Sequence, residues 1–381
     1  MRLAIRVLAV ICFLAGIALY GVRAADRFLN APRRPADRAA PGNPVGRPVP
    51  VVDLHTDALL WDRPLLERAS TGQVDLPRLR EGHVILEVFS ATNSFPLGAN
   101  YRRTPPGPDL VGLVAVANHW PSASWDSPLE RALAQAAVLH RTADASHGRL
   151  RLVTSRDGLP SPGSDADSTA AILSIEGLHG LHDGVAAVDR LFAAGFRIFG
   201  LAHMTDNAVA GSAHGWRKGG LTPFGYRVVA RIDSLGGIVD LAHASASTIT
   251  DVLATGATRV MVSHTGVDGT CPGNRNLSDG ELRAIAATGG IVGIGFWKGA
   301  VCGDDLAAIA RAIRHAADVA GADHVALGSD FDGAVRTPVD AAGIQQLVPA
   351  LRAAGFSASE IAAIMGGNAI RFLERTLPPG D

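Results

Sequence analysis

Short runs of hydrophobic, often β-branched residues alternate with Ala-rich amphipathic stretches from residue 51 to the end of the chain. Compact apolar runs predict strands, and apolar positions that recur every three to four residues predict helices. The predicted strands are Val51–Thr56, Val84–Phe89, Ala171–Glu176, Arg197–Ala202, Gly237–Leu241, Arg259–Ser263, Gly290–Phe296 and His324–Ser329.

Helical patterns fill most of the gaps between these strands. Examples are Pro128–Ala143, Phe224–Leu235, Asp304–Ala320 and Ala341–Ala354, and a final helix is predicted over Ser357–Arg375, opening with a capping-box pattern of Ser357 and Glu360. The gap between the second and third strands is unusually long. It holds a turn-rich piece, Pro96–Pro108, and one predicted helix. We expect this insertion to cover one end of the sheet.

Eight strand–helix units predict an α/β fold, a closed (β/α)8 TIM barrel, in which an active site would lie at the C-terminal strand ends. The alternative is an open doubly wound sheet. That fold usually carries a Gly-rich phosphate loop after the first strand, whereas this strand ends in His55-Thr56-Asp57. We therefore predict one barrel domain over residues 51–381.

The residues before the barrel have a different composition. An apolar run from Val7 to Val22 follows Arg2 and Arg6 and is short for a membrane span, which needs ~20 residues. It predicts a signal peptide over 1–25, cleaved after Ala24 or Ala25, or an uncleaved membrane anchor. Both place the barrel outside the cytoplasm, in the periplasm or secreted. Residues 26–50, rich in Pro and Arg, predict a linker.

Charge and length narrow the class of protein further. The 381 residues are 47% hydrophobic, which suits one large domain. A net charge of -1, without a basic excess, argues against a nucleic-acid partner.

Ionisable side chains stand at the ends of six of the eight predicted strands. His55 and Asp57 are two residues apart, so in an extended segment they share a face. The others are Glu176, His203, His243, His264 and Asp330. Each alone fits a buried structural residue, but their gathering at one barrel mouth predicts a metal site. Imidazole and carboxylate ligands suit Zn²⁺ or a similar ion, and a bridging Glu would allow two ions ~3.5–4 Å apart.

The motifs together resemble the membrane dipeptidase (renal dipeptidase) family of zinc peptidases over roughly residues 50 to 376. They are His55-x-Asp57, Glu176-Gly-x-His179, His243, His264, Arg275-Asn276, Gly-Ser-Asp330-Phe-Asp-Gly and the tail Met365-Gly-Gly-Asn-Ala-Ile-Arg371. The chain departs from the family in three places: it has Leu54 before His55, a shortened segment between His203 and His243, and Phe296-Trp297 where a tyrosine is frequent. These departures concern substrate preference rather than the metal ligands.

The resemblance implies that the barrel over residues 51–381 is catalytic and of the metal-dependent hydrolase type, and it implies a role for each candidate residue. His55, Asp57 and Glu176 would hold one zinc, and Glu176, His243 and His264 a second, giving two Zn²⁺ per chain. His203 would contact substrate and assist catalysis, and Asp330 would lie beside the metal-bound water. Arg275, with Asn276 beside it, would receive the substrate carboxylate. Asp53 would help to orient His55 without binding the metal itself. A homodimer is left open, because dimers are common in the family.

The function that follows is hydrolysis of small dipeptides by a metal-bridging hydroxide, with Asp330 moving the proton. One alternative is a related barrel amidase, an amino-acylase or lactonase. Many of those bridge their metals with a carboxylated lysine, but neither Lys218 nor Lys298 ends a predicted strand. Another is a non-catalytic, metal-bound surface protein, which would be expected to lack Asp330 or a ligand.

Three cysteines remain. Cys12 lies in the N-terminal apolar run, and no CxxC spacing is present. Relatives with matching cysteines suggest that Cys271 and Cys302 form a disulfide, which an extracytoplasmic location would permit. Two free buried thiols are the alternative.

Overall fold

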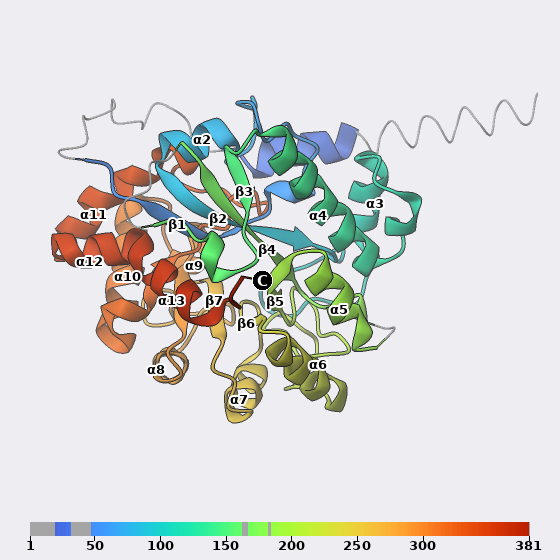
Figure 1. Cartoon of the computed structure of the whole chain (residues 1–381). Helices are drawn as coiled ribbons and strands as arrows, with labels where there is room; N and C mark the ends of the chain where they lie inside the picture. The colour runs from blue at the N-terminus through green and yellow to red at the C-terminus, as the bar shows by residue number, and fades with distance from the viewer. Residues whose placement is uncertain (1–19, 32–46, 162–166, 182–183, 381) are drawn as a thin grey trace, which may run out of the picture.

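A single parallel sheet forms the centre of the molecule. The computed structural model describes residues 20–31, 47–161, 167–181 and 184–380. The strands lie in the order β2-β1-β9-β8-β7-β6-β5-β4-β3, and β2 also pairs with β4. This second pairing closes eight strands into a barrel (Figure 1), so the predicted (β/α)8 fold is confirmed.

All eight predicted strands are present, with ends that shift by a few residues. The strands are β1 Val51–Thr56, β2 Val84–Thr92, β3 Leu150–Leu152, β4 Thr169–Glu176, β5 Phe196–Gly200, β6 Ile238–Asp240, β7 Val260–Thr265, β8 Ile291–Ile294 and β9 Val325–Leu327. The short strand β3 was not predicted. It pairs with Thr169–Ala171 of β4, just ahead of the stretch Leu173–Ile175 that pairs with β5.

Helices surround the barrel and cover its outer face (Figure 1). The α-helices are α2 Leu76–Glu81, α3 Leu110–Ala117, α4 Pro128–Ala145, α5 Ala186–Ala193, α6 Pro223–Ser234, α7 Ala246–Ala254, α8 Asp279–Ala287, α9 Lys298–Val301, α10 Leu306–Ala320, α11 Leu347–Ala353, α12 Ala358–Ala362 and α13 Asn368–Thr376. Short 3-10 turns are η2 Ala58–Leu60, η3 Ser122–Ser124, η4 Arg156–Gly158, η6 Ala322–His324 and η7 Ala341–Gln346. The long insertion after β2 thus contains two α-helices, α3 and α4, rather than the one predicted.

The final helical region closes the end of the barrel where the strands begin. The capping box of Ser357 and Glu360 is present at the start of α12. A π-helical turn, η8 Ala363–Gly367, then separates α12 from α13. Ile370 and Leu373 of α13 pack into the cluster of inward-facing strand residues that includes Val52. Chemistry is therefore left to the opposite end, where the strands finish.

Residues 20–29 are helical, and the residues at the end of this helix dock on the barrel. Asp26 and Asn30 are buried, and Arg63 Nε lies 3.4 Å from Asp26 Oδ2. Ala334 N donates to Asn30 Oδ1 over 2.9 Å. The segment expected to be a linker therefore begins with ordered contacts.

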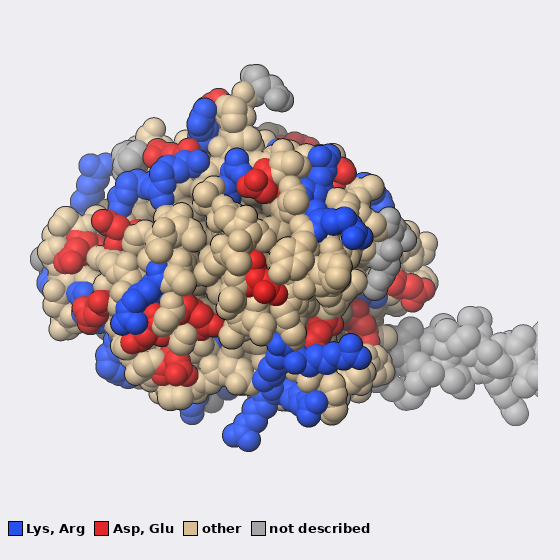
Figure 2. Space-filling view, turned by 90° about the horizontal axis from the view of Figure 1, so that it is seen from below, with Lys and Arg blue, Asp and Glu red and all other residues tan. Residues whose placement is uncertain are grey.

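Most of the apolar run Val7–Val22 lies outside the described residues. Among the residues that are described, no helix has the length and apolar character needed to cross a bilayer. On the face seen in Figure 2, acidic and basic side chains are interspersed around uncharged surface.

Candidate metal centre

The first and fourth strands bring three predicted ligands together. His55 and Asp57 come from the end of β1, and Glu176 is the last residue of β4. His55 Nε2 lies 3.6 Å from Glu176 Oε1 and 3.7 Å from Asp57 Oδ2. All three side chains are buried, because the barrel closes around the strand ends.

Two more predicted ligands face the same carboxylate oxygen. Nε2 of His243 and Nε2 of His264 lie 3.1 and 3.4 Å from Glu176 Oε1. These two nitrogens are 3.0 Å from each other. Glu176 Oε1 therefore lies between three imidazole nitrogens contributed by three different strand ends.

The electrostatics of this cluster suit a bound cation. Nε2 of His55 is buried and has no hydrogen-bond partner among the described residues. Burial alone would lower the pKa of His55, but Asp57, Glu176 and Asp330 outweigh it and raise the pKa to about 10. The carboxylates around this nitrogen thus favour positive charge, which a divalent ion would supply.

Three of the other candidate ligands, His243, His264 and Glu176, have pKa shifts in the directions that favour metal binding. Burial is the main cause that lowers the pKa of both His243 and His264 well below the usual range, leaving neutral rings with free lone pairs. Burial would raise the pKa of Glu176, but the surrounding histidines hold it well below its usual value. Ligand atoms of the cluster lie within 4.8 Å of one another in several overlapping groups of three.

His203 and Asp330, the predicted catalytic pair, lie at the edge of this cluster. His203 Nδ1 is 3.0 Å from the carbonyl of Ser94, and its Nε2 is 3.4 Å from Glu176 Oε2. Asp330 Oδ1 is 4.0 Å from His55 Nε2. Burial raises the pKa of Asp330 well above its usual value, despite the nearby histidine. A carboxyl group that holds its proton more tightly suits proton transfer near neutral pH.

A strained loop after β9 aims Asp330 into the barrel mouth. Asp330, Asp332 and Ala334 all have positive φ, at 63°, 63° and 57°. A backbone conformation of this kind costs about 1–3 kcal/mol per residue, and it persists only where surrounding contacts hold it in place. The Asp332 carboxylate accepts from the backbone N of Gln73 over 2.8 Å and pairs with Arg63 Nη2 at 2.8 Å.

Arg275 is buried beside the cluster without an acidic partner. Its Nη2 donates to the carbonyl of His264 over 2.7 Å, and its guanidinium lies 5.3 Å from the Trp297 ring centre. Among the described residues, no carboxylate lies within 4.0 Å of it. Asp279, the acidic residue that follows this loop at the start of α8, pairs with His315 at 2.7 Å.

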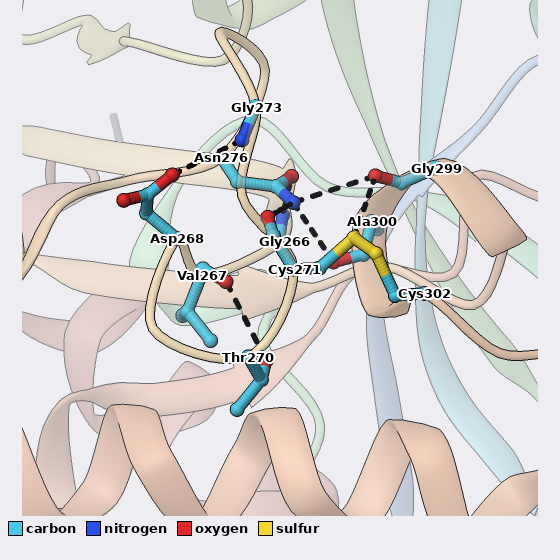
Figure 3. Close-up of a disulfide and its surroundings, with 10 residues drawn as sticks. All are labelled: Gly266, Val267, Asp268, Thr270, Cys271, Gly273, Asn276, Gly299, Ala300 and Cys302. Carbon is cyan, nitrogen blue, oxygen red and sulfur yellow. Dashed lines mark hydrogen bonds between the residues drawn. A yellow bond between two sulfur atoms is a disulfide. The ribbon is translucent and has the colours of Figure 1, made fainter.

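Asn276 has both ends of its amide engaged within the chain. Nδ2 donates to the carbonyls of Cys271 (2.6 Å) and Ala300 (3.1 Å), and Oδ1 accepts from Gly266 N (3.1 Å). Figure 3 shows these bonds beside the disulfide between Cys271 and Cys302, which the structure contains. Asn276 therefore ties the loop that carries Arg275 to the segment after β8.

Several residues around the centre were not predicted. Thr92 Oγ1 donates to Asp57 and lies 3.3 Å from Glu176 Oε2. Ser263 Oγ donates to Asp240 and is 2.9 Å from His264 Nδ1. Thr92 and Ser263 stand at strand ends, so their position in the sequence could have indicated them.

Tyr101 and His214 were also missed, and both lie in loops without a strand-end signal. The Tyr101 and His214 rings are 5.2 Å apart. A Cβ added to Gly299 would lie 2.6 Å from Tyr101 Cε2, so the tyrosine packs closely on the segment after β8. Tyr101 comes from the turn-rich insertion, which thus reaches the barrel mouth as expected.

Known proteins resemble this chain along most of its length. Dipeptidase aclJ of Aspergillus oryzae is 30% identical over 353 residues, covering 85% of this chain and 78% of that protein. Dipeptidase 3 of Mus musculus is 28% identical over 346 residues, covering 85% of this chain and 64% of that protein. A metallo peptidase from Rhodobacter sphaeroides, solved with a phosphinate mimic of the dipeptide L-Ala-D-Ala, has a TM-score of 0.74 and 25% identity, covering 87% of this chain and 100% of that one.

The profile of one family also matches. It extends from residue 42 to residue 377 and so includes every strand of the barrel and every candidate ligand. The chain belongs to the membrane dipeptidase family, peptidase family M19.

Proposed function

We propose that this protein is a binuclear zinc dipeptidase that hydrolyses the peptide bond of small dipeptides. His55, Asp57 and Glu176 would hold one Zn²⁺, and Glu176, His243 and His264 the second. Support comes from the three imidazole nitrogens within 3.1–3.6 Å of one Glu176 oxygen. Neutral imidazoles and ionised carboxylates without cysteine are a suitable donor set for this ion.

The observation that carries the dipeptide substrate is the buried guanidinium of Arg275. Its Nε has no hydrogen-bond partner among the described residues, and burial lowers the pKa of Arg275 despite the nearby carboxylate of Asp330. A molecule that brings a carboxylate would therefore be a favourable partner for this charge. The free C-terminal carboxylate of a dipeptide would pair with Arg275 while the scissile carbonyl reaches the ligand cluster. The dipeptide mimic bound by the Rhodobacter sphaeroides relative supports the same substrate class.

The chain's own residues would then carry the remaining chemistry. When bound, two divalent ions supply a nucleophilic hydroxide from water near neutral pH and polarise the scissile carbonyl. Asp330 would take the proton of the attacking water and return it to the leaving amine. His203 donates its Nδ1–H to the backbone carbonyl of Ser94. To donate from Nε2 to the scissile carbonyl of the substrate as well, the ring would have to carry a second proton.

We place this activity outside the cytoplasm. The disulfide between Cys271 and Cys302 is typical of periplasmic and secreted proteins. The apolar run Val7–Val22 supplies either a signal peptide or a membrane anchor for that location.

The test replaces Arg275 with Ala and compares dipeptides with dipeptide amides. Removing one partner of a desolvated charge pair typically costs ~2–5 kcal/mol, so kcat/KM for dipeptides should fall by roughly two to three orders of magnitude. Dipeptide amides lack the carboxylate, so they should already be poor substrates of the unmodified protein. Their kcat/KM should therefore fall little further in the variant. Zinc content, measured on the same preparations, should be two ions per chain in both proteins.

Arg283→Ala is the matched control, because Arg283 is an exposed arginine of the following helix, α8. This control should have the same kcat/KM as the unmodified protein for both dipeptides and dipeptide amides. An equal loss on acids and amides in Arg275→Ala would contradict the carboxylate-reading role. Full activity in metal-free protein would contradict the metal centre, and faster hydrolysis of N-acyl amino acids than of dipeptides would favour an amidase.

A further inference from the structure

His214 is a fully buried histidine in the loop between β5 and α6, outside the proposed ligand set. Its two ring nitrogens face two different parts of the protein. Nε2 lies 3.1 Å from Nδ1 of His243, and Nδ1 lies 3.2 Å from the carbonyl oxygen of Tyr101. His214 thus connects the insertion after β2 to a side chain of the ligand cluster.

The chemistry of these contacts determines where each hydrogen lies. A carbonyl oxygen can only accept, so Nδ1 of His214 carries the proton that Tyr101 receives. In a neutral ring, Nε2 of His214 then has a lone pair and accepts from Nδ1–H of His243. Nε2 of His243 is left with its lone pair, directed at Glu176 Oε1 (3.1 Å) and at His264 Nε2 (3.0 Å).

Backbone contacts hold His243 in the conformation that this arrangement needs. His243 has a positive φ of 61°, which is uncommon for a residue other than glycine. Ala213 N, from the loop of His214, donates to the carbonyl of His243 over 2.8 Å. Thr104 N, from the insertion, donates to the carbonyl of His214 over 2.7 Å. The loop of His214 therefore contacts both the ring and the backbone of His243, and the insertion in turn holds that loop.

We propose that His214 is a positioning residue that sets the tautomer and ring orientation of His243 for metal binding. The inference rests on the metal-ligand role proposed above for His243. Residues that donate to or accept from the second nitrogen of a ligating histidine typically change metal affinity 10–100-fold when removed. Most such partners are carboxylates or carbonyls. Here a second imidazole transmits the polarity of the Tyr101 carbonyl to the ligand.

The role is specific to one of the two ions. On the other side of the cluster, Ser263 Oγ lies 2.9 Å from His264 Nδ1 and 3.5 Å from His55 Nδ1, and it is anchored to Asp240. His55 is thus oriented independently of His214. Loss of His214 should weaken the ion that His243 binds and spare the ion held by His55, Asp57 and Glu176.

The experiment measures binding of zinc alone to metal-free protein, by competition with a chromogenic chelator, in the unmodified protein and four variants. His214→Phe removes the acceptor and keeps a flat ring, and His214→Leu removes it with a smaller side chain if the phenylalanine does not fold. His214→Gln keeps an acceptor oxygen. His140→Leu is the matched control, because His140 is an exposed histidine whose Nε2 contacts the carbonyl of Ala194 far from the cluster.

We expect one of the two zinc equivalents to bind 10–100-fold more weakly in His214→Phe or His214→Leu, with the other equivalent unchanged. The glutamine variant should recover most of that loss, and His140→Leu should match the unmodified protein. The visible spectrum of the Co²⁺-loaded protein should change in the phenylalanine variant and return toward the original in the glutamine variant.

Two results would overturn the role of His214. One is parental affinity for both equivalents in the phenylalanine and leucine variants. The other is an equal weakening of both equivalents, without rescue by glutamine, accompanied by a lower melting temperature of the metal-free protein. A parent protein that binds no zinc would instead overturn the metal centre itself, which separates that failure from a failure of His214 alone.

Discussion

Glu87 is a buried acidic side chain behind the barrel wall that the proposed chemistry does not use. It pairs in register with Asp53 of the neighbouring strand, and both carboxyl groups are fully buried. Neither oxygen of Glu87 has a hydrogen-bond partner among the described residues. Burial, with Asp53 and Asp332 nearby, raises the pKa of Glu87 well above its usual 4.5.

This shift predicts that stability falls as pH rises. The folded protein keeps the Glu87 proton, whereas the unfolded chain releases it above about pH 4.5. The stability contributed by the raised pKa is therefore fully present below that value and is lost as pH rises toward the folded pKa. Glu87→Gln carries no charge at any pH, so its melting temperature should exceed that of the parent more at pH 8 than at pH 5.

Thermal unfolding of zinc-saturated samples across this range checks the prediction. Glu374→Gln, at an exposed glutamate of α13, is the control and should track the unmodified protein. A pH-independent difference between Glu87→Gln and the parent would show that Glu87 is ionised in the folded state.

Single residues also show where the sequence was informative about the site. His55, Glu176 and Asp330 could be predicted because a closed parallel barrel brings strand ends to one rim, whatever the loops do. His214 and Tyr101 could not, because their contacts depend on how two loops fold over that rim. Arg275 was indicated by resemblance alone, since nothing in its local pattern reveals that it is buried.

At the scale of elements, the loop after β9 is sensitive to added volume. A Cβ on Gly333 would lie 2.2 Å from Asp330 Oδ1 and 3.0 Å from Asp57 Oδ2. Gly333→Ala should therefore displace both carboxylates. A displacement near 1 Å at a reacting group can reduce the rate about 10²-fold, so we expect a loss of that order in kcat/KM for dipeptides.

Steady-state kinetics on dipeptides measure this loss. Gly219→Ala is the matched control, because a Cβ there meets nothing within 4 Å. Equal kinetics in Gly333→Ala and the unmodified protein would mean that the loop adjusts freely and that its strained backbone does not position Asp330.

The disulfide joins the loop of Arg275 to α9 and should contribute to stability. Cys271 and Cys302 are 31 residues apart, and closing a loop of that size contributes about 3–4 kcal/mol in the chain-entropy model. A Cys271→Ser/Cys302→Ser protein should unfold at lower denaturant concentration by that free energy. Its KM for dipeptides should rise, because the loop of Arg275 would keep the hydrogen bonds of Asn276 but lose the covalent link to the segment after β8, and so would be held less firmly.

Denaturant titration with and without a reductant makes the measurement. The reductant should destabilise the unmodified protein and a Cys12→Ser variant alike, and should leave the double variant unchanged. Two reactive thiols from Cys271 and Cys302 in the denatured, unreduced protein would contradict the bridge.

Elements differ in how well the sequence predicts them. α4, α6 and α10 have long periodic patterns, and their predicted limits agree with the structure to within a few residues. β3 has three residues, too few for a pattern, and exists because β4 offers a free stretch of edge ahead of β5. The predicted final helix is interrupted by a π-turn at Ala363–Gly367, where Gly366 lies close to the backbone of Pro50 and Val52.

At the scale of the whole molecule, the two ends of the barrel have separate tasks. The apolar side chains of α13 fill the end of the barrel at which the strands begin. Substitutions of Ile370 or Leu373 should therefore lower the stability of the fold rather than act on the chemistry directly. The other end holds the buried ionisable cluster and the insertion that reaches it. Eight repeating units could be predicted from the sequence because each has a strand pattern and most gaps between strands have a helical pattern, whereas the way their connecting loops meet depends on the closed barrel.

The closing of the barrel between β2 and β4 has a consequence for the order of folding. The proposed ligands come from β1, β4, β7 and the segments after β1 and β6, so they meet only when the β2–β4 and β1–β9 pairings have both formed. Contacts so distant in sequence form late, since chain entropy opposes them. An ion that binds only the finished barrel stabilises it by RT ln(1 + [L]/Kd), about 2.7 kcal/mol at a hundredfold excess over Kd. Zinc supply should therefore govern how slowly the barrel unfolds and have little influence on how fast it forms.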